Sequence, residues 1–241
     1  LAVNFLVYSF IKTLITDRKR WIQKSAVIMA VLFIPVIISS FVYSNYKEKG
    51  APSEVLVVHP STDNRDVKYR KNIYELMDIY LDIMLPELTE STDYVVLPET
   101  AITNAGWVKN LNRNKVFNYF HEHTDSFPDL KLVTGAVTYE EIPNVEKIKN
   151  YKKIPGIRYS ENYKTWYYTY NAALHIEKNQ PVQMRVKEGL VPFQEYAPYP
   201  LILPRISPVG IDFQFSPREN NREVFTSSNH LKTAAIICYE V

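Results

Sequence analysis

An uncharged stretch of eighteen residues near the start of the chain, AVIMAVLFIPVIISSFVY at 26–43, most limits what the chain can become. As a helix it would be about 27 Å long, close to the hydrocarbon thickness of a bilayer. Trp21 and Tyr46 flank it, and such aromatic residues favour the two membrane interfaces. A buried helix of a large soluble protein is the alternative, but Pro35 and an unbroken apolar circumference are better tolerated in lipid. We therefore predict a transmembrane helix over residues 25–46.

The residues before this helix set its predicted orientation. Residues 1–16 are mostly apolar and typical of the end of another transmembrane helix, so we expect a multi-pass membrane protein. The connection at 17–24 has four basic side chains, against Lys47 and Lys49 just after the second helix. This excess of basic residues predicts a cytoplasmic loop over 17–24. Residues 47–241 would then form a periplasmic domain of a protein of the cell inner membrane.

The composition of the chain indicates a globular domain without a cofactor signature. Of its 241 residues, 46% are hydrophobic, which is enough apolar material for a core. A formal net charge of +2, without a basic stripe, argues against nucleic-acid binding. The single cysteine excludes an internal disulfide and a multi-cysteine zinc site. His121 and His123 are two residues apart on a predicted helix and lean to different faces, so we expect neither a metal nor a cofactor.

From Glu54 onward, short apolar runs alternate with helical patterns, which is typical of an α/β domain. We predict one helix within residues 66–90 and another over 113–123. The predicted strands are 55–59, 94–99, 131–139, 165–177, 181–187 and 231–237. Residues 140–164 and 188–229 are polar or proline-rich and are predicted as loops. Because Val241 directly follows a strand-like run, we expect the domain to be incomplete at its C-terminal end.

Three reactive side chains follow three of these predicted strands. Glu99 ends the run YVVLPE, Lys187 ends PVQMRVK, and Cys238 follows TAAII. In open α/β sheets the carboxyl ends of the strands gather the ligand-binding loops, so we expect the three side chains to share one site. Each also has a structural alternative when taken alone: a surface carboxylate, a solvated lysine and a buried thiol.

A thiol, a carboxyl group and an amino group in one site are suited to acyl transfer. The thiolate of Cys238 would attack a carbonyl carbon, with Glu99 as general base. The ammonium of Lys187 would stabilise the oxyanion that develops. Because a cysteine thiol is mostly protonated at neutral pH, it needs such neighbours to react. We expect the carboxylate and the ammonium within roughly hydrogen-bonding reach of the sulfur, and more loosely so without a substrate.

Three short motifs carry a resemblance to a known family. LPETAI at 97–102, KEGLVPFQEYAP at 187–198 and CYE at 238–240 resemble the Glu, Lys and Cys motifs of the carbon-nitrogen hydrolase, or nitrilase, superfamily. The lysine motif, with LVPF and a glutamate eight positions after the lysine, is most similar to the apolipoprotein N-acyltransferases. The resemblance implies an α/β fold, a nitrilase-like α-β-β-α sandwich domain, preceded by transmembrane α-helices.

The resemblance also implies a role for each motif residue. Cys238 would form a thioester with an acyl chain taken from a phospholipid, with Glu99 as base and Lys187 as oxyanion stabiliser. The acceptor would be the N-terminal amine of a diacylglyceryl-cysteine lipoprotein, so the implied partners are a phospholipid acyl donor, a lipoprotein acceptor and the membrane. The residues that match supporting positions of the family are Glu195, Tyr239 and Glu240.

Two other functions stay open at the level of the sequence. A membrane-tethered nitrilase-type amidase would use the same three residues and resolve the thioester with water. A non-catalytic, membrane-anchored interaction domain would carry them on a nitrilase scaffold without a reaction. The aromatic and apolar residues within 190–206 favour the acyltransferase, because they suit acyl chains or insertion at a membrane interface.

Overall fold

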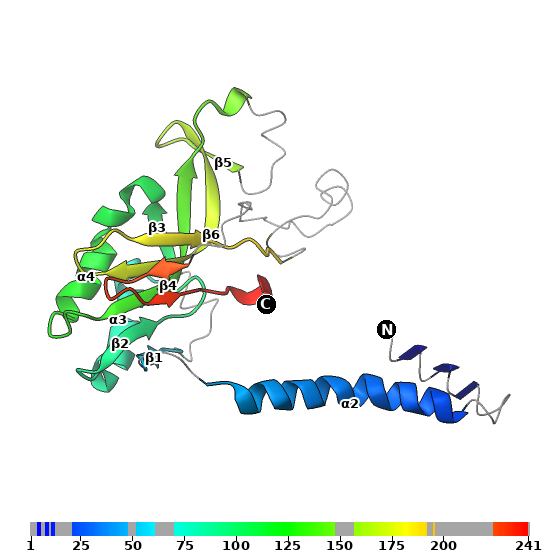
Figure 1. Cartoon of the computed structure of the whole chain (residues 1–241). Helices are drawn as coiled ribbons and strands as arrows, with labels where there is room; N and C mark the ends of the chain where they lie inside the picture. Colours follow the sequence, from blue (N-terminus) through cyan, green and yellow to red (C-terminus); the bar gives the residue numbers. More distant parts are fainter. Residues whose placement is uncertain are drawn as a thin grey trace. The chain divides into compact units, whose positions relative to one another are not determined.

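The computed structural model contains two compact units, Leu1–Pro52 and Ser53–Val241. The described residues are 4–5, 8–9, 11–12, 21–47, 52–60, 70–147, 157–191, 195 and 224–240. They can be followed along the colour bar of Figure 1. The boundary between the units falls after the predicted membrane helix and before the first predicted strand.

The first unit consists mainly of one long helix, α2, at Trp21–Asn45 (Figure 1). Its segment Ser25–Asn45 has a mean hydropathy of 2.5 and is not buried against other parts of the chain. This segment is therefore long and apolar enough to cross a membrane. Pro35 lies inside the helix without ending it. Of the predicted first helix, the described residues are also helical: 4–5, 8–9 and 11–12.

Helix α2 begins earlier than the sequence predicted. It starts at Trp21, so the prediction of a loop over 17–24 is wrong for residues 21–24. This stretch contains neither proline nor glycine, and nothing in it prevents helical hydrogen bonds from continuing. Basic residues influence which side of a membrane a segment faces, but they do not interrupt a helix.

The second unit is a mixed α/β structure with a mostly sheet core. Among its described residues, seven strands form one sheet in the order β1-β2-β4-β6-β5, with β3 beside β4 and β7 beside β6. The parallel pairs are β1–β2, β2–β4 and β3–β4. Strand β6 runs antiparallel to β4, β5 and β7. The bounds are β1 Glu54–Val57, β2 Thr92–Val96, β3 Ile102–Trp107, β4 Lys131–Glu141, β5 Ile157–Ser160, β6 Thr165–Glu177 and β7 Gln183–Val186.

Two helices, α3 at Ile73–Met84 and α4 at Lys115–His123, cover one side of this sheet (Figure 1). A short 3-10 turn, η1 at Leu85–Glu87, follows α3, and another, η2 at Val108–Arg113, precedes α4; a third, η3 at Val145–Lys147, follows β4. The main core lies where the helices meet the strands, and its members include Met77, Met84, Phe120, Leu132 and Leu174. This packing confirms the strand, helix, strand unit that the helical spacing predicted for residues 66–90.

Asparagine side chains decide where both helices begin. Oδ1 of Asn72 accepts hydrogen bonds from the N–H groups of Tyr74 and Glu75 at 2.9 and 3.0 Å. Oδ1 of Asn114 accepts from the N–H of Val116 at 2.8 Å. An N-terminal cap satisfies donors that have no partner inside the helix. The second helix therefore starts at Lys115 rather than at residue 113 as predicted.

The strand predictions succeed best in the middle of the sheet. Strand β6 has the predicted bounds, 165–177, and β4 extends the predicted 131–139 by two residues. Besides β8 at Phe225–Thr226, which lies inside the predicted loop 188–229, two strands of the seven-stranded sheet were missed: β3, and β5 inside the predicted loop 140–164. Both have mixed, partly exposed sequences, ITNAGW and IRYS, that lack a long apolar run. They are strands because β4 and β6 offer them backbone partners.

A small hairpin precedes the cysteine. It consists of β8 at Phe225–Thr226 and β9 at Lys232–Thr233. The predicted final strand, 231–237, is therefore wrong beyond Thr233. Backbone groups of Ala235 and Ile237 hydrogen-bond to side chains instead of to a neighbouring strand. Of the predicted loops, residues 148–156, 192–194 and 196–223 lie outside the described part of the chain.

Candidate active site

Glu99 lies in a tight turn shortly after β2. The N–H of Ala101 donates to the carbonyl oxygen of Pro98 at 3.2 Å and closes the turn. Thr100 has a φ of +51°, in the left-handed region that non-glycine residues seldom adopt. The side chain of Glu99 is 35% exposed. The turn thus presents one carboxylate beyond the carboxyl end of a strand, at the place that the sequence predicted.

Strand β4 brings Gly135 against this turn. Its N–H donates to the carbonyl oxygen of Pro98 at 3.2 Å. A Cβ atom at Gly135 would lie 2.4 Å from the nitrogen of Thr100 and 2.6 Å from Cα of Glu99, which is closer than unbonded atoms approach. Only glycine fits here. The signal was a glycine inside the apolar strand pattern 131–139, which indicates a close backbone approach.

Lys187 directly follows β7 and is buried beside Glu99. Its N–H donates to the carbonyl oxygen of Asn171 in β6 at 2.8 Å, which continues the strand pairing. Nζ donates to Oε1 of Glu99 at 3.0 Å and to Oε1 of Glu195 at 2.9 Å. Only 1% of the side chain is exposed. The predicted base and the predicted oxyanion stabiliser are therefore in direct contact.

Two opposing effects act on the pKa of Lys187. Burial lowers it, but the hydrogen bonds and charges of Glu195 and Glu99 raise it by more, so the pKa of Lys187 lies above its ordinary value. Lys187 is therefore an ammonium at neutral pH. A buried charge needs such partners, because an unpaired one would be expensive to remove from water.

Glu195, the predicted supporting acid, completes the contacts of this ammonium. Its Oε1 accepts from Lys187, and its Oε2 accepts from the N–H of Val191 at 2.7 Å. The N–H of Glu195 donates to the carbonyl oxygen of Val191 at 2.9 Å. The side chain is 12% exposed. These bonds hold Glu195 to Val191 and to the lysine.

Asn171 is a member of the cluster that the sequence analysis missed. It lies in β6 and is 1% exposed. Nδ2 donates to Oε1 of Glu99 at 2.6 Å and to Oε1 of Glu195 at 3.2 Å. One amide therefore orients both carboxylates. The available signal was a polar residue in the apolar half of the strand TWYYTYNAALHIE, where burial requires a hydrogen-bonding partner.

Cys238 begins a short 3-10 helix, η5, at Cys238–Glu240, and it is exposed. Its φ is +47°, a left-handed conformation that costs about 1 to 2 kcal/mol for a residue with a side chain. In the described part of the chain, no hydrogen bond joins Sγ of Cys238 to Glu99 or Lys187, and these two residues bind each other instead. The described contacts therefore do not include a direct bond from either group to the sulfur, and the rough proximity expected without a substrate stays a prediction.

Glu99 and Cys238 nevertheless line the same cavity, which has a volume of about 630 Å³. This volume is within the range of ligand pockets, about 300 to 1,000 Å³. Lys187 does not line the cavity, but it forms an ion pair with Glu99, which does. The other lining residues are mostly apolar and include Val55, Val96, Leu97, Val133, Ala173 and Ile237. The thiol of Cys238 and the carboxylate of Glu99 thus line the same mostly apolar cavity, without a hydrogen bond between them.

Glu240 is held firmly, two residues after the cysteine. Its carboxylate accepts from Nη1 of Arg185 at 2.7 Å, and from the N–H groups of Glu188 and Ile237 at 2.7 and 3.0 Å. Burial raises the pKa of Glu240, but Arg185 and the two N–H groups lower it by more, so its pKa lies below the ordinary value. Arg185 was missed by the sequence analysis. The side chain of Tyr239, also a predicted supporting residue, lies outside the described part.

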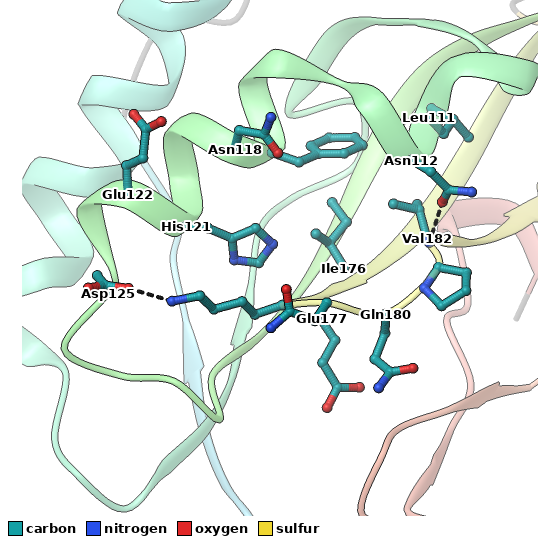
Figure 2. Close-up of a pocket in the computed structure, with 14 residues that line it drawn as sticks. Leu111, Asn112, Asn118, His121, Glu122, Asp125, Ile176, Glu177, Gln180 and Val182 are labelled. Atoms are coloured by element: carbon teal, nitrogen blue, oxygen red, sulfur yellow. Dashed lines mark hydrogen bonds and ion pairs between the residues drawn. The ribbon is translucent and has the colours of Figure 1, made fainter.

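A larger cavity of about 860 Å³ is lined by none of the predicted site residues. Figure 2 shows His121 of α4 beside the ion pair of Lys178 with Asp125. Burial and, to a smaller extent, the charge of Lys178 lower the pKa of His121. Of the charged residues in this wall, Lys178 pairs with Asp125, and Glu177 accepts hydrogen bonds from Ser228, so the wall does not bring a thiol, a carboxylate and an ammonium together as the predicted site would.

The described residues contain no group of three or more His, Cys, Asp or Glu side chains placed to hold a metal ion. A comparison with protein-family models and one with curated proteins each found no match. The functional conclusion therefore depends on the geometry of the site, the apolar helix and the three sequence motifs.

Proposed function

We propose that the chain belongs to a nitrilase-type, membrane-anchored apolipoprotein N-acyltransferase. It transfers a fatty acyl chain from a phospholipid, through a thioester on Cys238, to the N-terminal amine of a diacylglyceryl-cysteine lipoprotein. The observation that carries the proposal is the cavity shared by Glu99 and Cys238, with the ammonium of Lys187 bound to the same carboxylate. In this proposal the second unit is a nitrilase-like α-β-β-α sandwich.

The first half of the reaction forms the thioester. Glu99 removes the thiol proton, and the sulfur of Cys238 attacks the ester carbonyl carbon of the phospholipid. The positive charge of Lys187, 3.0 Å from Oε1 of Glu99, stabilises the oxyanion that forms beside that carboxylate. The carbon–oxygen bond to the glycerol breaks, and the glycerol oxygen takes the proton from Glu99. The products are a lysophospholipid and the acyl thioester.

The second half of the reaction forms an amide. The N-terminal amine of the lipoprotein attacks the thioester carbonyl, and Glu99 takes a proton from the nitrogen. The carbon–sulfur bond breaks, and the sulfur of Cys238 recovers its proton. Asn171 and Glu195 keep Glu99 and Lys187 in place during both halves, through the bonds of 2.6 to 3.2 Å described above. The scheme is a two-step, ping-pong reaction.

Two further features favour lipid substrates over soluble ones. The cavity beside Cys238 has a mostly apolar lining, which suits an acyl chain. Helix α2 contains a segment long and apolar enough to cross a membrane, which would keep the enzyme at the surface where both lipid substrates are found. We place the catalytic domain on the periplasmic side of the inner membrane, in a multi-pass protein, because the basic residues at 17–24 favour the cytoplasm.

A transfer assay tests this function. Full-length protein in detergent is incubated with phosphatidylethanolamine carrying a labelled acyl chain and with a synthetic diacylated lipopeptide. We expect the label on the lipopeptide amine, and no transfer in Cys238→Ala or Glu99→Gln. Release of labelled free fatty acid without lipopeptide product would identify the amidase-like hydrolase instead. Neither product from the wild type would contradict an acyl-transfer function.

A further inference from the structure

Arg185 is a buried cation to which the proposed chemistry gives no role. It lies in β7, two residues before Lys187, and pairs with Ala173 of β6. Its side chain is 10% exposed. A guanidinium remains charged at every pH that proteins tolerate, so its burial requires several well-placed acceptors.

The acceptors of Arg185 lie on both sides of Cys238. Nη1 donates to the carbonyl oxygen of Ala235 at 2.6 Å and to Oε2 of Glu240 at 2.7 Å. Nη2 donates to Oε1 of Glu240 at 3.2 Å. One planar guanidinium therefore binds the backbone before the cysteine and the carboxylate after it. The two contacts to Glu240 form the bidentate geometry that is specific to arginine.

Glu240 extends this clamp to two backbone N–H groups. It accepts from Ile237, the residue before Cys238, and from Glu188, the residue after Lys187. The carboxylate side chain is 6% exposed. The pair Arg185–Glu240 thus joins the turn of the thiol to the end of the strand that carries the lysine. Without Arg185, a buried carboxylate would lose its counter-charge and would tend to leave its two N–H partners.

The backbone of Cys238 needs such a constraint. A residue with a side chain stays at a φ of +47° only where the surrounding contacts determine the conformation. Here the residues at 235, 237 and 240 are all fixed by Arg185 or Glu240. We propose that Arg185 is a positioning residue that, through Glu240, holds Cys238 in the left-handed conformation facing the cavity it shares with Glu99. This inference rests on the proposed function for its kinetic test only.

The kinetic test measures the single-turnover rate at which Cys238 is acylated by phosphatidylethanolamine. In Arg185→Met we expect this rate constant to fall about 100-fold, the effect of misplacing a reacting group by roughly 1 Å. The lipid concentration for half-maximal rate stays within twofold, because Arg185 does not contact the substrate. Arg185→Lys restores only part of the rate, since an ammonium cannot make the bidentate contact. An unchanged rate in either variant overturns the inference.

The matched control is Lys109→Met, which removes a cation from an exposed ion pair with Glu141, 2.8 Å long. We expect its acylation rate to equal that of the wild type, and an equal loss in both variants overturns a specific role for Arg185. Added guanidinium ions are expected to restore acylation in Arg185→Ala at least fivefold, whereas ammonium ions are not. Failure of this rescue in a folded Arg185→Ala also overturns the inference.

Hydrogen exchange separates this inference from the proposed function. We expect the amides of Ile237 and Glu188, which donate to Glu240, to exchange at least tenfold faster in Arg185→Met than in the wild type. The amides of β4 and β6 are expected to keep their protection, which shows that the sheet is intact. If the wild-type protein is not acylated, the proposed function is contradicted but the positioning role of Arg185 is not. If exchange at these two amides is unchanged in Arg185→Met, the positioning role is contradicted but the proposed function is not.

Discussion

At the scale of single residues, the position of Glu99, the candidate base, depends on a glycine, Gly135, which has no side chain. Gly135 in β4 lies so close to the turn of Glu99 that a Cβ atom would be 2.6 Å from Cα of Glu99 and 2.8 Å from its carbonyl carbon. These neighbours are backbone atoms, so they cannot rotate away as a flexible side chain would. A residue other than glycine must displace the turn, and with it the carboxylate that contacts Lys187.

We therefore predict that Gly135→Ala destabilises the protein by about 1 to 3 kcal/mol, the usual range for overpacking. Because the displaced atoms belong to Glu99, we also expect Cys238 acylation to slow by about 100-fold. The measurements are chemical denaturation and the single-turnover rate with phosphatidylethanolamine.

Ala136→Gly, at the neighbouring buried residue of β4, is the control. It is expected to lose about 1 kcal/mol of stability through backbone freedom, without a change in acylation rate. If Cys238 is acylated in Gly135→Ala at the wild-type rate, Gly135 does not position Glu99 as described.

The residues of the cluster differ in how readily the sequence reveals them. Glu99, Lys187 and Glu195 were predicted because they occur in short motifs, and their mutual contacts agree with a common site. Asn171 and Arg185 were missed, because a single polar residue within a strand does not indicate which distant group it will bind. Their partners become visible only when β6, β7 and η5 are brought together.

At the scale of elements, the β8–β9 hairpin leads directly into the segment of Cys238, and polar contacts hold it on the sheet. Oγ of Ser227 shares hydrogen bonds with the hydroxyl of Tyr94 at 2.6 Å and with Nε2 of His175 at 3.1 Å. The side chain of Gln183 pairs with the backbone of Thr226 at 2.8 and 2.9 Å. A hairpin of this size is not stable alone, so these contacts decide its place.

Protonation of His175 should weaken this docking. The side chain is fully buried, and burial is the main reason that its pKa lies below the ordinary value of 6.5. Glu177 opposes the shift and Lys131 adds to it. Since the unfolded chain takes up the proton first as the pH falls, the contribution of His175 to stability is present above pH 6.5 and is lost below it.

We predict that the free energy of unfolding decreases from pH 7 to pH 5, by about 1.4 kcal/mol for each unit by which the pKa of His175 is lowered. His175→Gln should reduce this slope, whereas His59→Gln, at an exposed residue, should retain it. Urea denaturation at a series of pH values measures the slope. Equal slopes in the wild type and in His175→Gln would contradict the assignment.

The elements also show what a sequence pattern can predict. Strands β4 and β6 were predicted well because they are long and apolar and lie in the centre of the sheet. The run TAAII looked like a strand of the same kind. In the structure only its first residue, Thr233, belongs to β9, because Arg185 and Glu240 bind the backbone that follows. Local apolar character could not reveal this competition between side-chain and strand hydrogen bonds.

At the scale of the whole chain, an apolar helix long enough to cross a membrane and a mixed α/β unit occur in one polypeptide. Hydropathy alone predicted the helix, and the alternation of short apolar runs with helical patterns predicted the α/β unit. The shared cavity of Glu99 and Cys238 brings together residues from opposite ends of the second unit's sequence. Its existence depends on the sheet and on the segment 231–238, so no local pattern could have predicted its size or its lining.

The central claim is that Cys238 is a nucleophile in the site of Glu99 and takes an acyl chain from a phospholipid. Intact-mass spectrometry of the full-length protein after incubation with phosphatidylethanolamine tests it most directly. We expect an added mass of one acyl chain that maps to Cys238, is removed by hydroxylamine and is absent in Cys238→Ala. A wild-type protein that gains no acyl mass, or gains it at another residue, would contradict the claim.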